Sequence, residues 1–406
     1  MTNNALTLSE RKIQLIVWTL IFCNPLIGMA IDLVAPSLPA ISVSLQVSPS
    51  VAKWVISIYL FGYALGNFFT GFLTDALGRQ KLLRLGFLGF VLASLAPVVF
   101  PSIQVLLTAR FFQGITIGAA AVIIRAVLSD ILPSEKLIRL SLLLATMWGI
   151  GPIIGPLIGG YLQLYFGWQA GFCFFAVASL ILLIIIFTVV PETHFNRHPL
   201  HPKIMQKNLL EILHHRTFLA LITIMGLVYS SITVFNTAGP FLIQTEFHHT
   251  PVFFGRLALC LGVVFLLSTI LCRFLLKKLE TEQLFLVVSN ALLGLSSIFV
   301  IASYLFPQNM VLVAIGTAFM FFGAGFLFPI SMGRGMTLFR HIAGTANAVM
   351  YLVNVLLTSL SSFLISFVSM NTAIPLMWVY FILVFICVII YWRFVRIPRI
   401  TIIKKK

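Results

Sequence analysis

Charged residues are scarce in this sequence. Of its 406 residues only 9% are charged and ten are acidic, whereas 60% are hydrophobic and the mean hydropathy is +1.09. Soluble domains carry about 25% charged residues, so this composition excludes an ordinary soluble protein. We expect an integral membrane protein. Because its apolar runs are far longer than the ~10-residue strands of a membrane barrel, the spanning elements are expected to be helices.

The sequence also lacks the patterns of redox, metal and catalytic sites. Its five cysteines lie within or at the ends of apolar runs and show no Cys-x-x-Cys spacing, which favours a packing role. No P-loop, His-Glu-x-x-His, Gly-x-Ser-x-Gly or dinucleotide-binding fingerprint occurs. We therefore predict that the protein is not an enzyme, that it uses no cofactor and no metal, and that an ion gradient is its energy source.

What the sequence does contain is a series of apolar runs of about twenty residues, each long enough to cross ~30 Å of hydrocarbon. These runs predict twelve transmembrane helices and an all-α membrane fold. They lie near residues 13–35, 51–73, 82–99, 103–127, 138–163, 169–190, 217–242, 252–273, 283–305, 310–331, 343–367 and 373–394.

The longest hydrophilic segment divides the twelve runs six and six. This division predicts an N-terminal six-helix bundle (1–193), a cytoplasmic linker (194–216) and a C-terminal six-helix bundle (217–406). Within the linker, residues 203–215 follow two prolines and predict a short amphipathic helix on the membrane surface. Five histidines also fall there, but they lack an acid or cysteine at ligand spacing, which favours a solvated linker over a metal site.

The positions of lysine and arginine predict the orientation. An even number of spans puts both termini on one side, and 22 of the 26 basic residues fall in the terminal segments and loops of that side. By the positive-inside rule both termini are expected in the cytoplasm. The net charge of +16 then reflects topology, so we expect no nucleic-acid partner. The expected setting is a bacterial inner (plasma) membrane, with the protein as a monomer in the lipid bilayer.

A polar turn marked by two glycines separates the second and third runs. Residues 71–81 read Gly-Phe-Leu-Thr-Asp-Ala-Leu-Gly-Arg-Gln-Lys. This stretch resembles the loop between helices 2 and 3 of the major facilitator superfamily, whose pattern is Gly-x-Leu-x-Asp-x-x-Gly-Arg-x-Lys. The resemblance implies two six-helix bundles around a cavity that opens alternately to each side. We predict an inner gate here, with the alternative that its charges only anchor the topology. The expected gate residues are Gly71, Asp75, Gly78, Arg79, Arg125 and Asp130.

Two charged residues of the predicted spans stand out. Asp32 is the only acid within a span, and Arg110 lies in the fourth span, in a stretch that resembles the superfamily pattern Leu-x-x-Arg-x-x-Gln-Gly-x-x-x-Gly-Ala. Charges at such depth are costly unless they face the bundle interior and have partners. We predict that the two pair as a proton switch, because burial disfavours an ionised carboxylate and a nearby guanidinium favours it. The alternatives are that Asp32 reaches water and that Arg110 only binds backbone carbonyls.

A further resemblance concerns the direction of transport. The fifth span contains glycines four residues apart, which allow close helix approach, and two prolines, which allow bending. The pattern resembles the motif of the superfamily's antiporters and so implies export. With Asp32-x-x-x-Pro36-x-x-Pro39 and Gly344-Thr345-Ala346 it is similar to the Bcr/CflA type of multidrug exporter, which implies coupling roles for Asp32 and Arg110. The motif residues are Gly151, Pro152, Gly155, Pro156, Gly159 and Gly160.

The predicted cargo site is a cavity of aromatic, methionine and amide side chains with one acid. Such a wall suits bulky amphipathic molecules, neutral or cationic. We therefore expect a proton-coupled antiporter that exports small amphipathic compounds by alternating access. The alternatives are a dedicated transporter of a natural metabolite such as a siderophore, or a non-transporting membrane receptor on the same fold. The expected cavity residues are Asn24, Met29, Tyr59, Tyr63, Gln113, Trp148, Tyr229 and Asn236.

Overall fold

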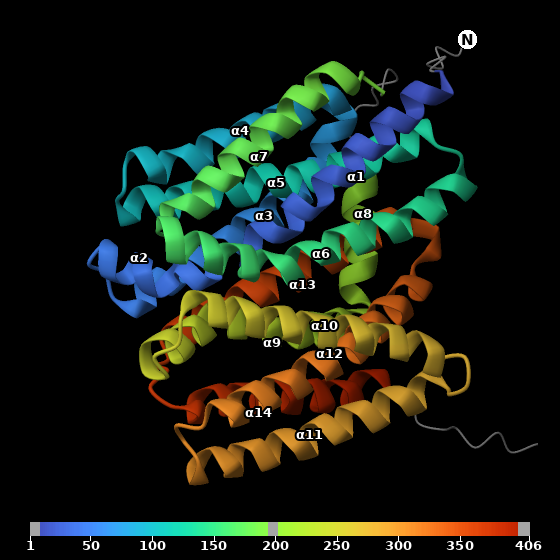
Figure 1. The fold of residues 1–406 in the computed structure, drawn as a ribbon. Helices are drawn as coiled ribbons and strands as arrows, with labels where there is room; N and C mark the ends of the chain where they lie inside the picture. The colour runs from blue at the N-terminus through green and yellow to red at the C-terminus, as the bar shows by residue number, and fades with distance from the viewer. Residues whose placement is uncertain (1–8, 194–201, 397–406) are drawn as a thin grey trace, which may run out of the picture.

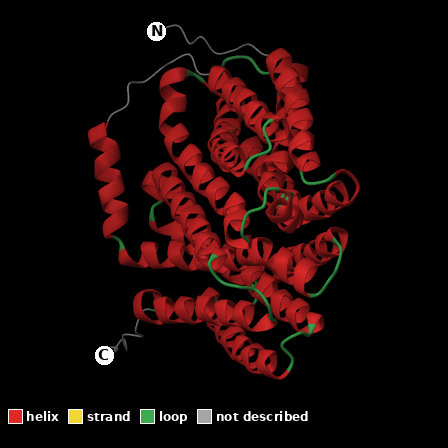
Figure 2. Ribbon diagram, turned by 90° about the vertical axis from the view of Figure 1, so that its left-hand side faces the viewer, coloured by secondary structure: helices red, strands yellow, loops and turns green. Residues whose placement is uncertain are grey.

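The first half of the chain forms a bundle of six long helices. The computed structural model describes residues 9–193 and 202–396, and in these residues it contains helices and no strand (Figure 2). A short 3₁₀ turn (Ala35–Ser37) leads from α1 into α2. The helices are α1 (Glu10–Asp32), α2 (Leu38–Ser44), α3 (Pro49–Leu77), α4 (Arg79–Val99), α5 (Ile103–Ile131), α6 (Ser134–Phe166) and α7 (Gln169–Val189).

The second half forms another bundle of six long helices, which lies below the first in Figure 1. The shorter α8 (Pro202–His214) precedes it and coincides with the amphipathic helix predicted in the linker. Residues 194–201 of that linker lie outside the described residues, and the exact bundle boundaries stay a prediction. The long helices are α9 (Arg216–Pro240), continued by the π-helix η2 (Phe241–Glu246), α10 (Pro251–Leu275), α11 (Thr281–Leu305), α12 (Met310–Leu338), α13 (Ala343–Ser366) and α14 (Ala373–Ile390), continued by the π-helix η4 (Tyr391–Val395).

The long helices fit a membrane. Eleven helical segments of the described residues are long and apolar enough to cross a bilayer. The remaining long helix, α6, has 33 residues and packs between α1 of its own half and α10 of the other. Six long helices in each half confirm the predicted all-α architecture, and the protein is a multi-pass membrane protein.

Polar residues before the apolar runs determine where several helices begin. Ser48, Ser102, Thr250 and Asn309 each accept a hydrogen bond from the backbone N–H three residues later, at the starts of α3, α5, α10 and α12. Each side chain satisfies one of the N–H groups that a helix leaves unpaired at its first turn. All four caps lie at the end of the bundle opposite residues 9 and 396. We call this the distal end, and the other the terminal end.

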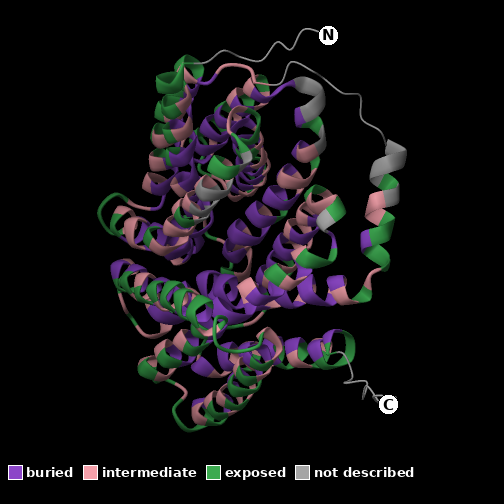
Figure 3. Ribbon diagram, turned by 90° about the vertical axis from the view of Figure 1, so that its right-hand side faces the viewer, coloured by how far each residue is buried: buried purple, intermediate pink, exposed green. Residues whose placement is uncertain are grey.

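The two halves meet along two pairs of helices. α3 packs on α13, and α6 packs on α10. At the distal end Lys53 Nζ donates to the carbonyl of Val368 (3.0 Å), and Trp54 Nε1 donates to Ser366 Oγ (3.0 Å). The hydrogen bonds that join the halves in the described parts all lie in the distal half of the bundle, which is therefore closed. Figure 3, a view of the terminal end, shows buried residues gathered where helices face one another.

Candidate functional site

The acid at the end of α1 contacts the other half of the molecule. Asp32 is 3% exposed, and its Oδ1 accepts a hydrogen bond of 2.7 Å from Nδ2 of Asn236 in α9. Asn236 is 4% exposed. We expected Asn236 to line a cargo cavity, whereas its amide is the direct partner of the carboxylate. The sequence signal was an amide inside a span, but nothing in the sequence indicates which residue of the first half faces it.

The buried arginine holds three helices of the first half together. Arg110 of α5 is fully buried; its Nε donates to the carbonyl of Val55 in α3 (3.0 Å) and its Nη1 to the carbonyl of Ala30 in α1 (3.1 Å). The guanidinium also lies 4.0 Å from the ring centroid of Tyr59, a cation–π contact. Charge-assisted bonds from Nε and Nη1 hold the guanidinium without an acid, and its buried Nη2 has no hydrogen-bond partner among the described residues.

The direct ion pair expected between Asp32 and Arg110 is not formed. Both side chains are described, and no salt bridge joins them. The reason is geometric: the carboxylate faces Asn236 of the other half, whereas the guanidinium binds the carbonyl of Ala30 two residues earlier. The two groups interact electrostatically without touching. The alternative in which Arg110 binds backbone carbonyls describes the observed contacts, and the joint role in proton coupling stays a prediction.

Gln113 belongs to the network of this arginine. Its Oε1 accepts from Arg110 Nη1 (3.1 Å), and its Nε2 donates to Ser94 Oγ in α4 (2.7 Å). With no exposed surface, Gln113 does not line a cavity as expected, but extends the network to a fourth helix. Asn24, also expected in the cavity, bonds to its own helix: its Nδ2 donates to the carbonyl of Leu20 (2.9 Å).

Aromatic side chains from both halves surround the acid. Tyr59 and Tyr63 stack in α3 with centroids 6.3 Å apart, and Tyr63 interacts with Trp148 of α6. Tyr229 of α9 interacts electrostatically with both Asp32 and Tyr63. The structure therefore brings these four predicted cavity residues to one place between the halves, next to Asp32. Met29, 9% exposed, instead packs between α1 and Gly155 of α6.

The predicted gate forms a cluster within the first half. Arg79 Nε lies 3.2 Å from Asp130 Oδ2 in α5, and Arg79 Nη1 donates to Thr74 Oγ1 (2.8 Å). The pair links α4 to α5 within the first half and joins two of the expected gate residues, and their role as a gate stays a prediction. The side chain of Asp75 lies outside the described residues. Arg125 does not join the cluster; its guanidinium lies 5.2 Å from the ring centroid of Tyr351 in α13.

Glu192 completes this cluster, although it was not among the expected gate residues. Its carboxylate accepts the backbone N–H groups of Arg79 (3.0 Å) and Gln80 (3.3 Å), at the first turn of α4. A carboxylate at a helix N-terminus accepts from the unpaired N–H groups there and interacts favourably with the positive end of the helix dipole. Thr193 donates from Oγ1 to Asp130 Oδ2 (2.8 Å). The end of α7 is thus tied to α4 and α5. Sequence reasoning could not find this because residue 192 is over a hundred positions away from its partners.

The glycine motif packs α6 on two sides. A Cβ added at Gly151 or Gly159 would collide with the backbone of α1, and one added at Gly160 would lie 2.6 Å from the carbonyl of Pro251 in α10. A Cβ added at Gly255 of α10 would lie 2.5 Å from the carbonyl oxygen of Pro156. Such distances are possible only without side chains. The motif therefore sets the approach of α6 both to its own half and to the other half. At Gly71, by contrast, an added Cβ would meet no described atom within 4 Å.

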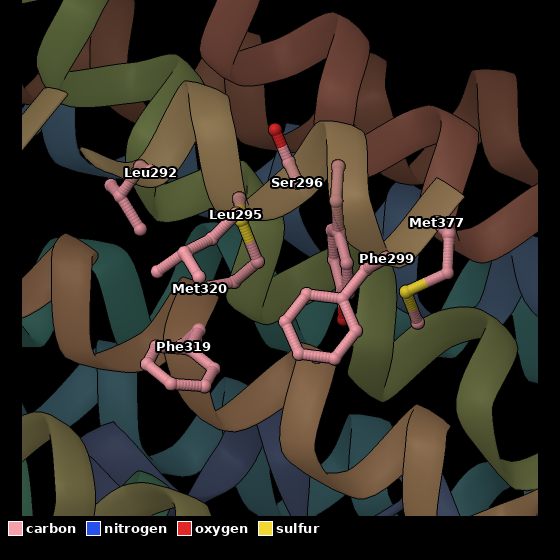
Figure 4. Close-up of a pocket in the computed structure, with 9 residues that line it drawn as sticks. Leu292, Leu295, Ser296, Phe299, Phe319, Met320 and Met377 are labelled. Carbon is pink, nitrogen blue, oxygen red and sulfur yellow. The ribbon is translucent and has the colours of Figure 1, made fainter. Parts of the chain in front are cut away.

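One pocket in the described part lies away from this site. Figure 4 shows it between α11, α12 and α14, lined mainly by apolar residues such as Leu295, Phe319 and Met320. Its cavity volume is about 10 Å³, far less than the about 300–1,000 Å³ of small-molecule sites. No group of three or more His, Cys, Asp or Glu side chains in residues 9–193 and 202–396 is arranged to hold a metal ion.

Two six-helix halves with one buried carboxylate between them define the class of protein as a secondary transporter. A sequence profile of the Major Facilitator Superfamily matches residues 20–362, and the chain belongs to that family. It is 26% identical over 386 residues to the bicyclomycin resistance protein homolog of Haemophilus influenzae, covering 94% of this chain and 96% of that one. It is 27% identical over 350 residues to the multidrug resistance protein MdtM of Escherichia coli (82% of each chain).

Solved structures agree with this fold. A crystal structure of a D-xylose–proton symporter superposes with a TM-score of 0.74 at 16% identity, over 95% of this chain and 98% of that chain. The peptide transporter POT in complex with sulfate gives a TM-score of 0.74 at 13% identity, over 93% and 94%. At such identities the likeness shows the fold alone.

Proposed function

We propose that the protein is a proton-coupled antiporter that exports small amphipathic compounds across a bacterial inner membrane. The observation that carries this proposal is the position of Asp32, the only acid within a span, buried at the contact between the halves. A group there can bind a proton and sense how the halves are arranged. The relatives named for multidrug and bicyclomycin resistance support export of such compounds. The basic loops favour cytoplasmic termini.

In this proposal the structure is the state closed to the outside. With the termini cytoplasmic, the distal end faces outward, and the hydrogen bonds of Lys53 and Trp54 seal it. Opening to the outside requires these bonds to break as the halves rock about α6 and α10, whose glycine and proline contacts form the pivot. Cargo would bind beside Tyr63, Trp148 and Tyr229, which lie next to Asp32.

The proton gradient supplies enough free energy to drive export against a concentration gradient. One proton moving inward through ~100 mV yields about 2.3 kcal/mol, and a pH difference of one unit adds about 1.4 kcal/mol. One-for-one exchange of a neutral solute then supports roughly a 500-fold concentration ratio.

Reconstitution tests the proposal directly. The purified protein is placed in liposomes with an imposed pH gradient, and dyes and antibiotics are screened for accumulation. We expect accumulation of at least one amphipathic compound that collapses when a protonophore is added. If no compound moves with the gradient although counterflow of the same compounds occurs, the protein is a facilitator and proton coupling is refuted. If nothing moves at all, the receptor alternative is favoured.

A further inference from the structure

The bond between Asp32 and Asn236 differs from the other hydrogen bonds between the halves. In the parts that the structure describes, those bonds join hydroxyls, amides, an indole, an ammonium and a guanidinium to neutral acceptors, as in Ser57 with Ser362 (2.8 Å) and Gln244 with the carbonyl of Pro36 (2.9 Å). Only the bond from Asn236 has a carboxylate as its acceptor. Its strength therefore depends on whether Asp32 carries a proton.

The physical difference between the two protonation states is large. A hydrogen bond to an ionised acceptor is roughly twice as strong as one between neutral groups. An amide N–H that faces an ionised Asp32 is therefore held firmly, and one that faces the protonated acid is held weakly. The other groups that face the carboxylate are Arg110 of α5, Tyr59 of α3 and Tyr229 of α9. Arg110 and Tyr59 belong to the same half as Asp32, so Asn236 is the firm link to the second half.

The segment that carries Asn236 has a feature suited to movement. Four residues after Asn236, α9 ends at Pro240, and the chain continues as the π-helix η2. Pro240 removes a backbone donor, and π-helical turns loosen the regular hydrogen-bond ladder and recur at functional sites. The Asp32–Asn236 bond therefore lies beside a deformable point of the second half.

We propose that Asn236 is a coupling latch: its bond to ionised Asp32 holds the empty carrier in the distally closed state. The inference rests on the proposed function and deepens it. An empty carrier that reopened outward without its proton would pick up another proton and return, which dissipates the gradient without moving cargo. The latch slows this step. A proton on Asp32 weakens it, and cargo that competes for either side chain displaces it.

The first test measures conformation without any cargo. In a variant without the five native cysteines, nitroxide labels on Val43→Cys and Ser369→Cys, both exposed at the distal end of opposite halves, report the distance across that end by double electron–electron resonance. In alkaline buffer we expect the short distance to dominate, and acid to increase the long one. Asn236→Leu should lower the closed-to-open ratio in alkaline buffer about tenfold, which corresponds to about 1.4 kcal/mol. Asn236→Gln, which keeps an amide donor, should have a closed-to-open ratio between those of Asn236→Leu and the wild type.

A matched control separates the latch from a general loss of a buried amide. Asn354 of α13 is 5% exposed and its Oδ1 has no partner among the described residues. Asn354→Leu should leave the distances and their acid response unchanged. The latch is refuted if Asn236→Leu has the wild-type distance distribution in alkaline buffer, or if it keeps the full acid response.

The second test measures coupling. In potassium-clamped liposomes that enclose a pH-sensitive dye, Asn236→Leu should leak protons about tenfold faster than the wild type in the absence of cargo. Its counterflow of ethidium, the probe cation, should persist while proton-driven accumulation of ethidium falls. Equal loss of counterflow and accumulation, without a leak, would make Asn236 a cargo-binding residue and refute the latch. If the wild type drives neither ethidium nor any compound of the earlier screen with the proton gradient, the proposed function fails, and the distance measurements still decide whether the latch exists.

Discussion

The two halves connect their second and third long helices differently. In the first half a single residue, Gly78, joins α3 to α4, and a cluster of charges from α4, α5 and the end of α7 surrounds it. In the second half five exposed residues, 276–280, join α10 to α11 and are held by backbone bonds such as Lys278 N–H to the carbonyl of Leu275 (2.9 Å). The first turn is therefore bonded to residues of other helices, whereas the second is held by its own backbone.

The same contrast holds at the centre of the molecule. Among the described residues, the buried charged side chains are Asp32, Lys53, Arg79 and Arg110, and all four belong to the first half. The second half buries serine, threonine and asparagine side chains instead. The buried charges thus belong to the first half, including the acid that binds the proton in our proposal, and the second half contributes neutral groups such as Asn236. Matched substitutions in the two halves test this division.

The largest effect is expected from Asp32→Asn. The amide cannot ionise, so proton-driven accumulation in liposomes should fall from the wild-type ratio to that without a gradient, while the protein stays folded by circular dichroism. Glu246→Gln, which neutralises a partly exposed acid of the second half, should keep accumulation. Persistent uphill transport by the Asp32 variant would place proton coupling elsewhere.

A large loss of stability is expected from Arg110→Met. The substitution removes the hydrogen bonds from the charged guanidinium to the carbonyls of Val55 and Ala30, which costs at least about 2 kcal/mol. The apparent melting temperature in detergent should drop by several degrees. Arg273→Met, at an exposed site of α10, should change stability by less than about 0.5 kcal/mol. Equal melting temperatures for both variants would show that the arginine network does not stabilise the first half.

A moderate effect is expected from Gly78→Ala. Gly78 has φ +91°, a conformation that costs other residues about 1–3 kcal/mol, and an added Cβ would lie 2.6 Å from Glu192 Oε2. Thermal unfolding should show this loss. Lys278→Ala in the corresponding turn of the second half should show none, and a comparable loss there would remove the contrast between the two turns.

The smallest effect is expected from Glu192→Gln. The amide has one oxygen in place of the two that accept from Arg79 and Gln80, so it keeps one of these bonds, and it loses the favourable interaction with the helix dipole, worth about 0.3–1 kcal/mol. The difference in melting temperature should shrink in high salt, because salt screens the charge. Glu280 precedes α11 and makes no side-chain hydrogen bond to its first turn, so Glu280→Gln should have no measurable effect. A loss that is insensitive to salt would indicate that the lost hydrogen bond, and not the lost charge, dominates.

The sequence by itself determined the number of long helices, their division into two halves and the family, because apolar runs, loop charges and short motifs are local properties of the chain. It also indicated that Asp32 and Arg110 matter, because a charge inside an apolar run is visible without a structure. Only the tertiary structure decided their partners. Arg110 binds backbone carbonyls, which every residue possesses and no sequence pattern marks, and Asp32 meets an amide about two hundred residues away. Which side chains meet depends on how six helices of one half pack against six of the other, and that packing is a property of the whole fold.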